Sequence, residues 1–169
     1  MFLHGTLVCL IWVIGCHSVT GISCEAAISK MARHCPPPWL AYEGNCYLYV
    51  PQAKTYNDSE AYCANFSNSG RSVHLASVAN QEENDFMDAY ARAANSEGVF
   101  WIGYNDQKHE GNFTWTDGTP ADFELWHTKE PNNLNNQDCV RFLVIRSGHW
   151  DDEICNTTAN FMCEMQKIE

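Results

Sequence analysis

Five side chains that carry oxygen ligands gather between residues 130 and 152. They are Glu130, Asn132, Gln137, Asp151 and Asp152. Calcium takes about 6–8 oxygen ligands from carboxylates, amide carbonyls and backbone carbonyls, so this set predicts a calcium site. Pro131 follows Glu130, and a cis X-Pro bond would turn the carbonyl groups on either side of it toward one face. The alternative interpretation is a polar surface loop with a proline turn.

The predicted site must be positioned by ordered elements elsewhere in the chain. Residues 39–50 alternate in places around the turn Glu43-Gly44-Asn45, which predicts a hairpin. Residues 55–66 place apolar side chains at helical spacing, and Thr55 or Asp58 is expected to cap the start of that helix.

A second helix is predicted over residues 80–94. Asn80 followed by Glu83 matches a capping box. An apolar stripe then ends before Gly98, and its spacing indicates a face packed on the core. The stripe consists of Phe86, Met87, Tyr90, Ala91 and Ala94.

Three strands are predicted in the second half of the chain, over residues 100–103, 139–145 and 160–165. Residues 104–138 show little helical periodicity and are rich in Asn, Asp, Gly and Trp. A loop of this length in a compact domain is expected to have a function. Metal ions would organise it.

The chain has 169 residues, which is enough for one domain and its core. Its first residues contain an apolar run, residues 7–15, that is too short to span a bilayer. We interpret residues 1–21 as a secretory signal peptide cleaved before Ile22, with cleavage after Ser18 as the alternative. Residues 22–34 are then an N-terminal segment and residues 35–169 the folded domain, and the protein is expected to be secreted and extracellular.

Cysteine usage agrees with export to an oxidising compartment. Removal of the signal peptide leaves seven of the nine cysteines. Six can pair internally in 15 ways, and sequence alone does not choose among them. Cys24, near the mature N-terminus, is predicted to be the odd one and to link two copies of the chain. The alternatives are a bridge to another chain or a small-thiol cap.

The formal net charge of -11 disfavours nucleic acid and anionic membranes as partners, and nothing after the signal peptide is apolar enough for membrane insertion. The seven histidines and the cysteines form no His-x-x-x-His or Cys-x-x-Cys pair, so neither a zinc centre nor an enzyme is predicted. Four glycosylation sequons agree with secretion. They are at Asn57, Asn65, Asn112 and Asn156.

Several marks in one order resemble the C-type lectin-like domains of secreted and cell-surface proteins, over about Cys35 to Met165. The marks are the cysteines of this region, Trp101-Ile102-Gly103, Glu130-Pro131-Asn132 and Trp150-Asp151-Asp152. The resemblance implies an α+β fold with two helices, small antiparallel sheets and a long calcium-binding loop. It also implies three disulfides, Cys35 to Cys46, Cys63 to Cys163 and Cys139 to Cys155.

The resemblance further implies that the five residues named first hold the principal calcium ion. A second family site corresponds to Asp106, Glu110, Asn133 and Asp138, with an acidic loop satisfied by water as the alternative. Two residues depart from the family pattern, because Gln137 stands where Glu is common and Asp151 where Asn is common. The principal site keeps three carboxylates, so calcium binding is expected to survive.

In the family, two neighbouring sugar hydroxyls bind the calcium, and each also donates to a carboxylate and accepts from an amide. The motif Glu130-Pro131-Asn132 resembles the mannose-type arrangement. Gln137 can donate and Asp151 can only accept, however, which favours galactose or N-acetylgalactosamine with the sugar turned around. The apolar face of galactose commonly stacks on an aromatic ring. Candidates are Trp126, His127, His149 and Trp150, the last expected in the core.

The predicted function is therefore that of a calcium-dependent lectin in agglutination or innate recognition of microbes. The alternative is a module of the same fold that binds a protein, ice or mineral without sugar activity.

Overall fold

The computed structural model describes residues 35–68, 70–94 and 98–166. The predicted signal peptide and the segment that contains Cys24 lie outside the described residues. The elements, in chain order, are β1 (Leu40–Tyr42), β2 (Asn45–Lys54), α2 (Tyr56–Ala64), β3 (Val73–Leu75), α3 (Gln81–Ala93), β4 (Val99–Asn105), β5 (Thr114–Trp115), β6 (Cys139–Leu143), the 3₁₀ helix η2 (Val144–Arg146), β7 (His149–Glu153) and β8 (Ala159–Met165).

The strands form one connected sheet of eight strands in the order β1-β2-β8-β4-β6-β7, with β3 beside β8 and β5 beside β4. The predicted α+β class is confirmed, with two α-helices in the described part of the chain, but the sheet is mixed, because β4 and β8 run parallel. Both strands are buried along almost their whole length. Such strands lack the polar alternation of one-sided antiparallel strands, so their sequence does not reveal their direction.

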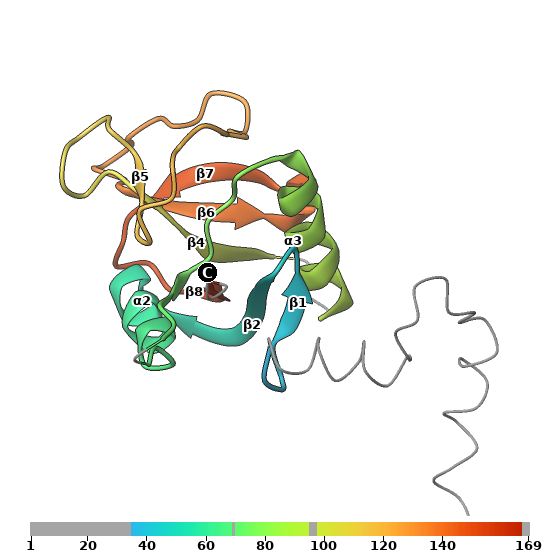
Figure 1. The fold of residues 1–169 in the computed structure, drawn as a ribbon. Coiled ribbons are helices and arrows are strands. Elements are labelled where there is room, and N and C mark those ends of the chain that lie inside the picture. Colours follow the sequence, from blue (N-terminus) through green and yellow to red (C-terminus); the bar gives the residue numbers. More distant parts are fainter. Residues whose placement is uncertain (1–34, 69, 95–97, 167–169) are drawn as a thin grey trace, which may run out of the picture.

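The two helices begin at the predicted caps. Thr55 accepts a hydrogen bond from the Asp58 N–H at the start of α2, and Asn80 accepts one from the Glu83 N–H at the start of α3. The Glu83 carboxylate accepts from the Ala79 N–H at 2.7 Å, one residue before the cap. Figure 1 shows α2 and α3 on opposite sides of the strands.

The core is built around aromatic side chains from the sheet and from the long loop. Phe100 on β4 and Phe142 on β6 stack with ring centroids 4.6 Å apart. Trp150 on β7 is fully buried, as predicted, and its indole N–H donates to Asn84 Oδ1 on α3 at 3.0 Å. The strand predicted over residues 139–145 ends at Leu143, because residues 144–146 form η2.

Among the described residues, three disulfides close the fold, and all three predicted pairings are confirmed. Cys35 pairs with Cys46, which is the second residue of β2. The bond between Cys63 and Cys163 joins α2 to β8 across 100 residues of sequence. The third, between Cys139 and Cys155, holds the start of β6 to the segment after β7.

Residues 106–138 form a long loop that includes β5, which pairs with β4, and in Figure 1 the loop lies at the upper left, next to β7. The sequence predicts that metal ions organise this loop, but protein contacts hold much of it. Trp150 exchanges backbone hydrogen bonds of 2.8 Å with Leu125 and His127. Phe113, Phe123 and Trp126 pack against the same core cluster as Trp150. The loop is therefore pinned to β7, the strand that carries Asp151 and Asp152.

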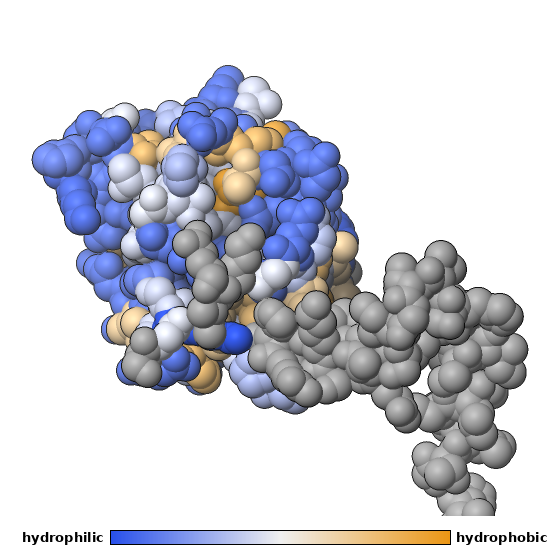
Figure 2. Space-filling model, viewed as in Figure 1, coloured by the Kyte–Doolittle hydropathy of each residue, from blue (hydrophilic) through white to orange (hydrophobic). Residues whose placement is uncertain are grey.

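The molecular face in Figure 2 is mainly hydrophilic, with scattered hydrophobic residues. Among the described residues, no helix combines the length and the apolar character needed to cross a membrane.

Candidate functional site

Strand β7 presents the two aspartates of the predicted site in opposite directions. Asp152 is buried and Asp151 is half-buried, in keeping with the alternation of a strand. The two Asp152 carboxylate oxygens accept from the backbone N–H groups of Asn132 and Asn133, at 3.0 and 2.6 Å. Asp152 thus anchors the loop segment that follows the cis peptide bond between Glu130 and Pro131.

Four of the five predicted calcium ligands meet in one hydrogen-bond network. The Asn132 side-chain amide donates to the Glu130 carboxylate. The Leu134 N–H donates both to Asn132 Oδ1, at 2.8 Å, and to Gln137 Oε1, at 2.9 Å. Because these two amide oxygens share one donor, they lie close together. With Asp152 behind them, they form a small cluster of carboxylate and amide oxygens.

The cluster is electrostatically suited to a cation. Burial raises the pKa of Glu130, and the neighbouring Asp152 raises it further, while the hydrogen bond from Asn132 opposes the rise. The charge of Asp151 raises the pKa of Glu130 as well. A bound cation would relieve this repulsion between carboxylates.

Asp151, the fifth predicted ligand, is engaged by a residue that the sequence analysis missed. Arg141 on β6 lies opposite Asp151 in the strand register. Its Nε and Nη2 donate to Asp151 Oδ1 and Oδ2 at 3.1 and 2.7 Å, and its Nη1 lies 2.7 Å from Glu153 Oε2. Burial raises the pKa of Asp151, and the bonds from Arg141 oppose that rise. The sequence showed an arginine in a predicted strand, but its pairing with Asp151 could be predicted only once the neighbouring strand and the register were known.

The residues predicted for a second calcium site also come together. Asn133 Nδ2 donates to Glu110 Oε1 at 2.8 Å, and the Asp106 N–H donates to the Asp138 carbonyl at 3.0 Å. Asp106 is 3% exposed, and its Oδ1 is a buried atom with no hydrogen-bond partner. Burial raises the pKa of Asp106 and of Asp138.

The oxygen atoms that could act as metal ligands in both clusters suit calcium. Within the described part of the chain, no group of three or more His, Cys, Asp or Glu side chains could hold a metal ion by itself. Each cluster instead mixes carboxylates with amide oxygens, which is the ligand chemistry of calcium. The orphaned Asp106 Oδ1 fits the same ion, because a buried carboxylate oxygen needs a partner. Zinc, which is held by Cys, His and carboxylate groups, is not indicated.

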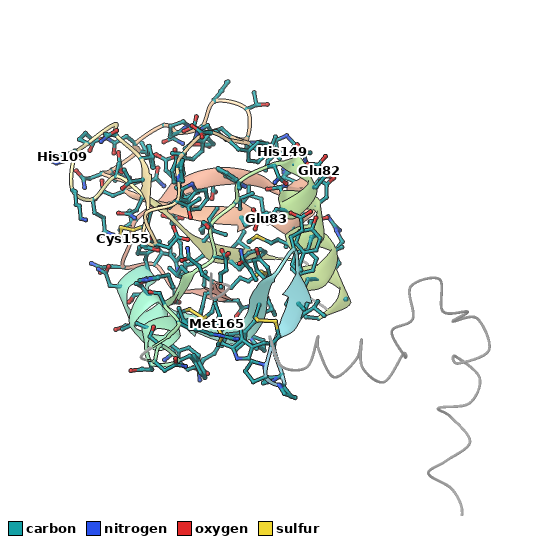
Figure 3. The ribbon with its side chains drawn as sticks, in the orientation of Figure 1. Glu82, Glu83, His109, His149, Cys155 and Met165 are labelled. Atoms are coloured by element: carbon teal, nitrogen blue, oxygen red, sulfur yellow. A yellow bond between two sulfur atoms is a disulfide. The ribbon has the colours of Figure 1, made fainter. Side chains whose placement is uncertain are left out.

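The aromatic candidates for sugar stacking differ in availability. Trp150 is fully buried and therefore excluded from stacking. Trp126 is half-buried and packs on Phe113, with ring centroids 5.0 Å apart. His127 and His149 are half-buried, with their rings perpendicular and 6.2 Å apart. Figure 3 shows His149 well separated from His109.

An apolar side chain at the ligand cluster was also missed. Leu134, whose N–H bridges the two amide oxygens, leaves 62% of its surface exposed. It follows the Glu-Pro-Asn motif by two residues, and this closeness in sequence could have indicated that Leu134 lies at the site.

The asparagines of all four glycosylation sequons are exposed.

Comparison with known proteins places this geometry in context. The family model described as "Lectin C-type domain" matches residues 52–165. The α-N-acetylgalactosamine-specific lectin of Patiria pectinifera is 39% identical over 139 residues, which cover 78% of this chain and 82% of that protein.

Two of the solved structures that share the fold are a lectin and an antifreeze protein. The C-type lectin CEL-I from Cucumaria echinata is 29% identical with a TM-score of 0.75, and the match covers 78% of this chain and 97% of that chain. A calcium-independent type II antifreeze protein is 29% identical with a TM-score of 0.68, and the match covers 77% of this chain and 92% of that chain.

Proposed function

The chain belongs to the C-type lectin domain family, and on that premise we propose that it is a calcium-dependent lectin for galactose-type sugars. The family and the relatives are lectins, which bind carbohydrates and are not enzymes. One observation carries the proposal: Asn132 Oδ1 and Gln137 Oε1 share the Leu134 N–H beside the Glu130 and Asp152 carboxylates.

Glu130, Asn132, Gln137, Asp151 and Asp152 would hold the principal calcium ion. Asp106, Glu110, Asn133 and Asp138 would hold a second. When bound, the principal ion accepts sugar hydroxyl oxygens as ligands. The protein contributes the hydrogen bonds that orient those hydroxyls, with carboxylates as acceptors and side-chain amides as donors.

The sugar preference follows from which side chains can donate. The Gln137 amide donates where a Glu would only accept, and Asp151 accepts where an Asn would also donate. This exchange favours galactose or N-acetylgalactosamine over mannose, although the Glu-Pro-Asn motif by itself suggests mannose. The name of the relative from Patiria pectinifera, a lectin specific for α-N-acetylgalactosamine, supports the same preference.

Affinity chromatography tests the metal, the class and the sugar together. The mature protein is passed over galactose and mannose columns with calcium and then eluted with a chelator. We expect retention on galactose and release by the chelator. Mannose retention would reject the donor and acceptor argument, and so would an unchanged sugar ranking in a Gln137→Glu, Asp151→Asn double variant.

The second candidate function is a binding module without sugar activity. The antifreeze protein with the same fold is described as calcium-independent, and Arg141 already balances the charge of Asp151 in this chain. Such a module would bind a protein, ice or mineral surface. Displacement of a bound partner by free galactose separates the two functions, because a protein-only interface would not respond to the sugar.

We also propose that the protein is secreted and that Cys24 links two copies into a dimer. Two sites held together would raise the avidity for clustered glycans without any new contact. Agglutination or innate recognition of microbes would follow. Non-reducing gels of the wild type and of Cys24→Ser test the dimer, and a wild type that migrates as a monomer would refute it.

A further inference from the structure

A guanidinium group lies directly beside the proposed calcium ligands. Arg141 holds both oxygens of Asp151 through Nε and Nη2, and it contacts Glu153 through Nη1. The side chains are largely buried, with 19% of Arg141, 17% of Asp151 and 18% of Glu153 exposed. The planar fork of an arginine matches a carboxylate in two parallel bonds, so this pairing fixes orientation as well as charge.

The network continues from Arg141 to the opposite side of the site. Gln137 Nε2 lies 3.4 Å from Glu153 Oε1, at the long end of hydrogen-bond range. Gln137 Oε1 accepts from the Leu134 N–H, which also donates to Asn132 Oδ1. Arg141 is therefore connected to Asp151 directly and to Gln137 through Glu153. Asp151 and Gln137 are the two residues in which the chain departs from the family pattern.

We propose that Arg141 is the positioning residue that sets the sugar preference of this site. Its two parallel bonds hold the Asp151 carboxylate in one orientation, and a carboxylate can offer a sugar hydroxyl only an acceptor. Through Glu153 it favours one orientation of the Gln137 amide, with the oxygen toward the ligand cluster and one N–H toward Glu153, so that the second N–H of the same nitrogen remains for a sugar hydroxyl. This inference rests on the proposed lectin function and names the residue on which its selectivity depends.

The test compares Arg141→Gln with wild type in a competition assay. Protein bound to immobilised galactose is displaced with free N-acetylgalactosamine or mannose, and the ratio of the two half-displacing concentrations is measured. We expect the variant to lose selectivity on the order of tenfold, the effect typical for loss of a residue that orients a ligand. Arg146→Gln is the matched control, because it removes the same charge from an exposed residue in η2, before β7 begins. Its ratio should equal that of wild type.

A double-variant cycle shows whether Arg141 acts through Asp151. If it does, adding Arg141→Gln to Asp151→Asn should change the ratio by less than Arg141→Gln alone changes that of wild type. Additive changes would overturn the inference. Arg141→Lys keeps the charge without the fork, so it should also lose selectivity, and it keeps the test available if Arg141→Gln does not fold.

Two further readouts separate the outcomes. Calorimetric titration with calcium alone shows whether a variant still binds the metal, and thermal unfolding in chelator reports on the protein without metal. If Arg141→Gln lowered the melting temperature but left the sugar ratio unchanged, the role of Arg141 would be merely structural. That result would overturn this inference and leave the proposed lectin function standing. A wild type without calcium-dependent sugar binding would overturn the proposed function, and this inference with it.

Discussion

The Leu134 backbone N–H shows how individual polar groups organise the site. By donating to Asn132 and Gln137 together, it brings two amide oxygens to one place. Asp152 holds the same loop segment in place by accepting hydrogen bonds from two further backbone N–H groups. Each interaction is short-range, and together they draw oxygen ligands toward one another before a metal ion is bound.

Replacement of Asp152 with Asn tests this residue-scale organisation. Asp152 is 2% exposed, and in the variant neither the Asn132 N–H nor the Asn133 N–H would keep a charged acceptor, while one of them would face the NH2 group of the new amide. We expect the free energy of unfolding in chelator to fall by about 1–3 kcal/mol. Calcium affinity should also fall, because a negatively charged ligand is replaced by a neutral one. Denaturant unfolding and calcium titration measure the two effects.

The control for this variant is Asp122→Asn, which removes the same charge from an exposed position in the same loop. It should change the free energy of unfolding by no more than about 0.5 kcal/mol. Equal stability of Asp152→Asn and wild type in chelator would show that the carboxylate does not anchor the loop.

At the scale of elements, the turn between η2 and β7 couples the site strand to α3. Gly148 in this turn has φ +77°, and a Cβ atom there would lie 2.5 Å from Asn84 Nδ2 and 2.8 Å from Phe142 Cζ. Asn84 is the α3 residue that accepts from the Trp150 indole. The glycine is thus required both by its backbone conformation and by the close approach of the helix.

We expect Gly148→Ala to destabilise the protein more than Gly118→Ala. Gly118 has a similar φ of +80°, but a Cβ atom added there would meet nothing within 4 Å. Both variants carry the backbone cost of about 1–2 kcal/mol, and only the first adds about 1–3 kcal/mol of overpacking. Urea unfolding of the two variants measures the difference. Equal destabilisation would mean that the contact between the turn and α3 relaxes without cost.

Across the whole molecule, a buried acidic network links α3, β2, β8 and the long loop. Glu164 on β8 accepts from Asn45 Nδ2 at 2.6 Å and from the Ser77 N–H at 3.0 Å. The carboxyl groups of Glu83 and Asp117 lie nearby, and the Tyr47 hydroxyl donates to Glu83. Burial, reinforced by the charge of Glu83, raises the pKa of Glu164 to about 8.

This shift makes the stability of the fold depend on pH. The pKa of Glu164 in the fold lies above its ordinary value of 4.5, so the folded protein binds this proton more tightly than the unfolded chain. The resulting stabilisation is fully present below pH 4.5 and is lost as pH rises through about 8. We expect Glu164→Gln, which cannot ionise, to lose less stability than wild type between about pH 5 and about pH 9.

Thermal unfolding across this range, with chelator present throughout, measures the difference. Glu43→Gln at an exposed turn position is the matched control and should follow the wild-type curve. A Glu164→Gln curve parallel to that of wild type would show that Glu164 does not hold its proton in the fold.

Local signals in the sequence were sufficient for several parts of this protein. Asn80 and Thr55 mark helix starts because their side chains cap N–H groups only three residues away. The α3 stripe and the burial of Trp150 follow from periodicity and from aromatic bulk. The oxygen-rich residues of the site were recognisable by type, and the disulfide pairing followed from the family resemblance, since spacing left 15 pairings open.

Only the tertiary structure decided which of these residues meet. The parallel alignment of β4 and β8, the bond of Trp150 to Asn84 and the pairing of Arg141 with Asp151 all join residues far apart or in separate strands. Cross-strand neighbours depend on register, and a shift of one residue would turn every side chain to the other face. Composition therefore predicted a site of carboxylates and amides, whereas the register placed a guanidinium beside it.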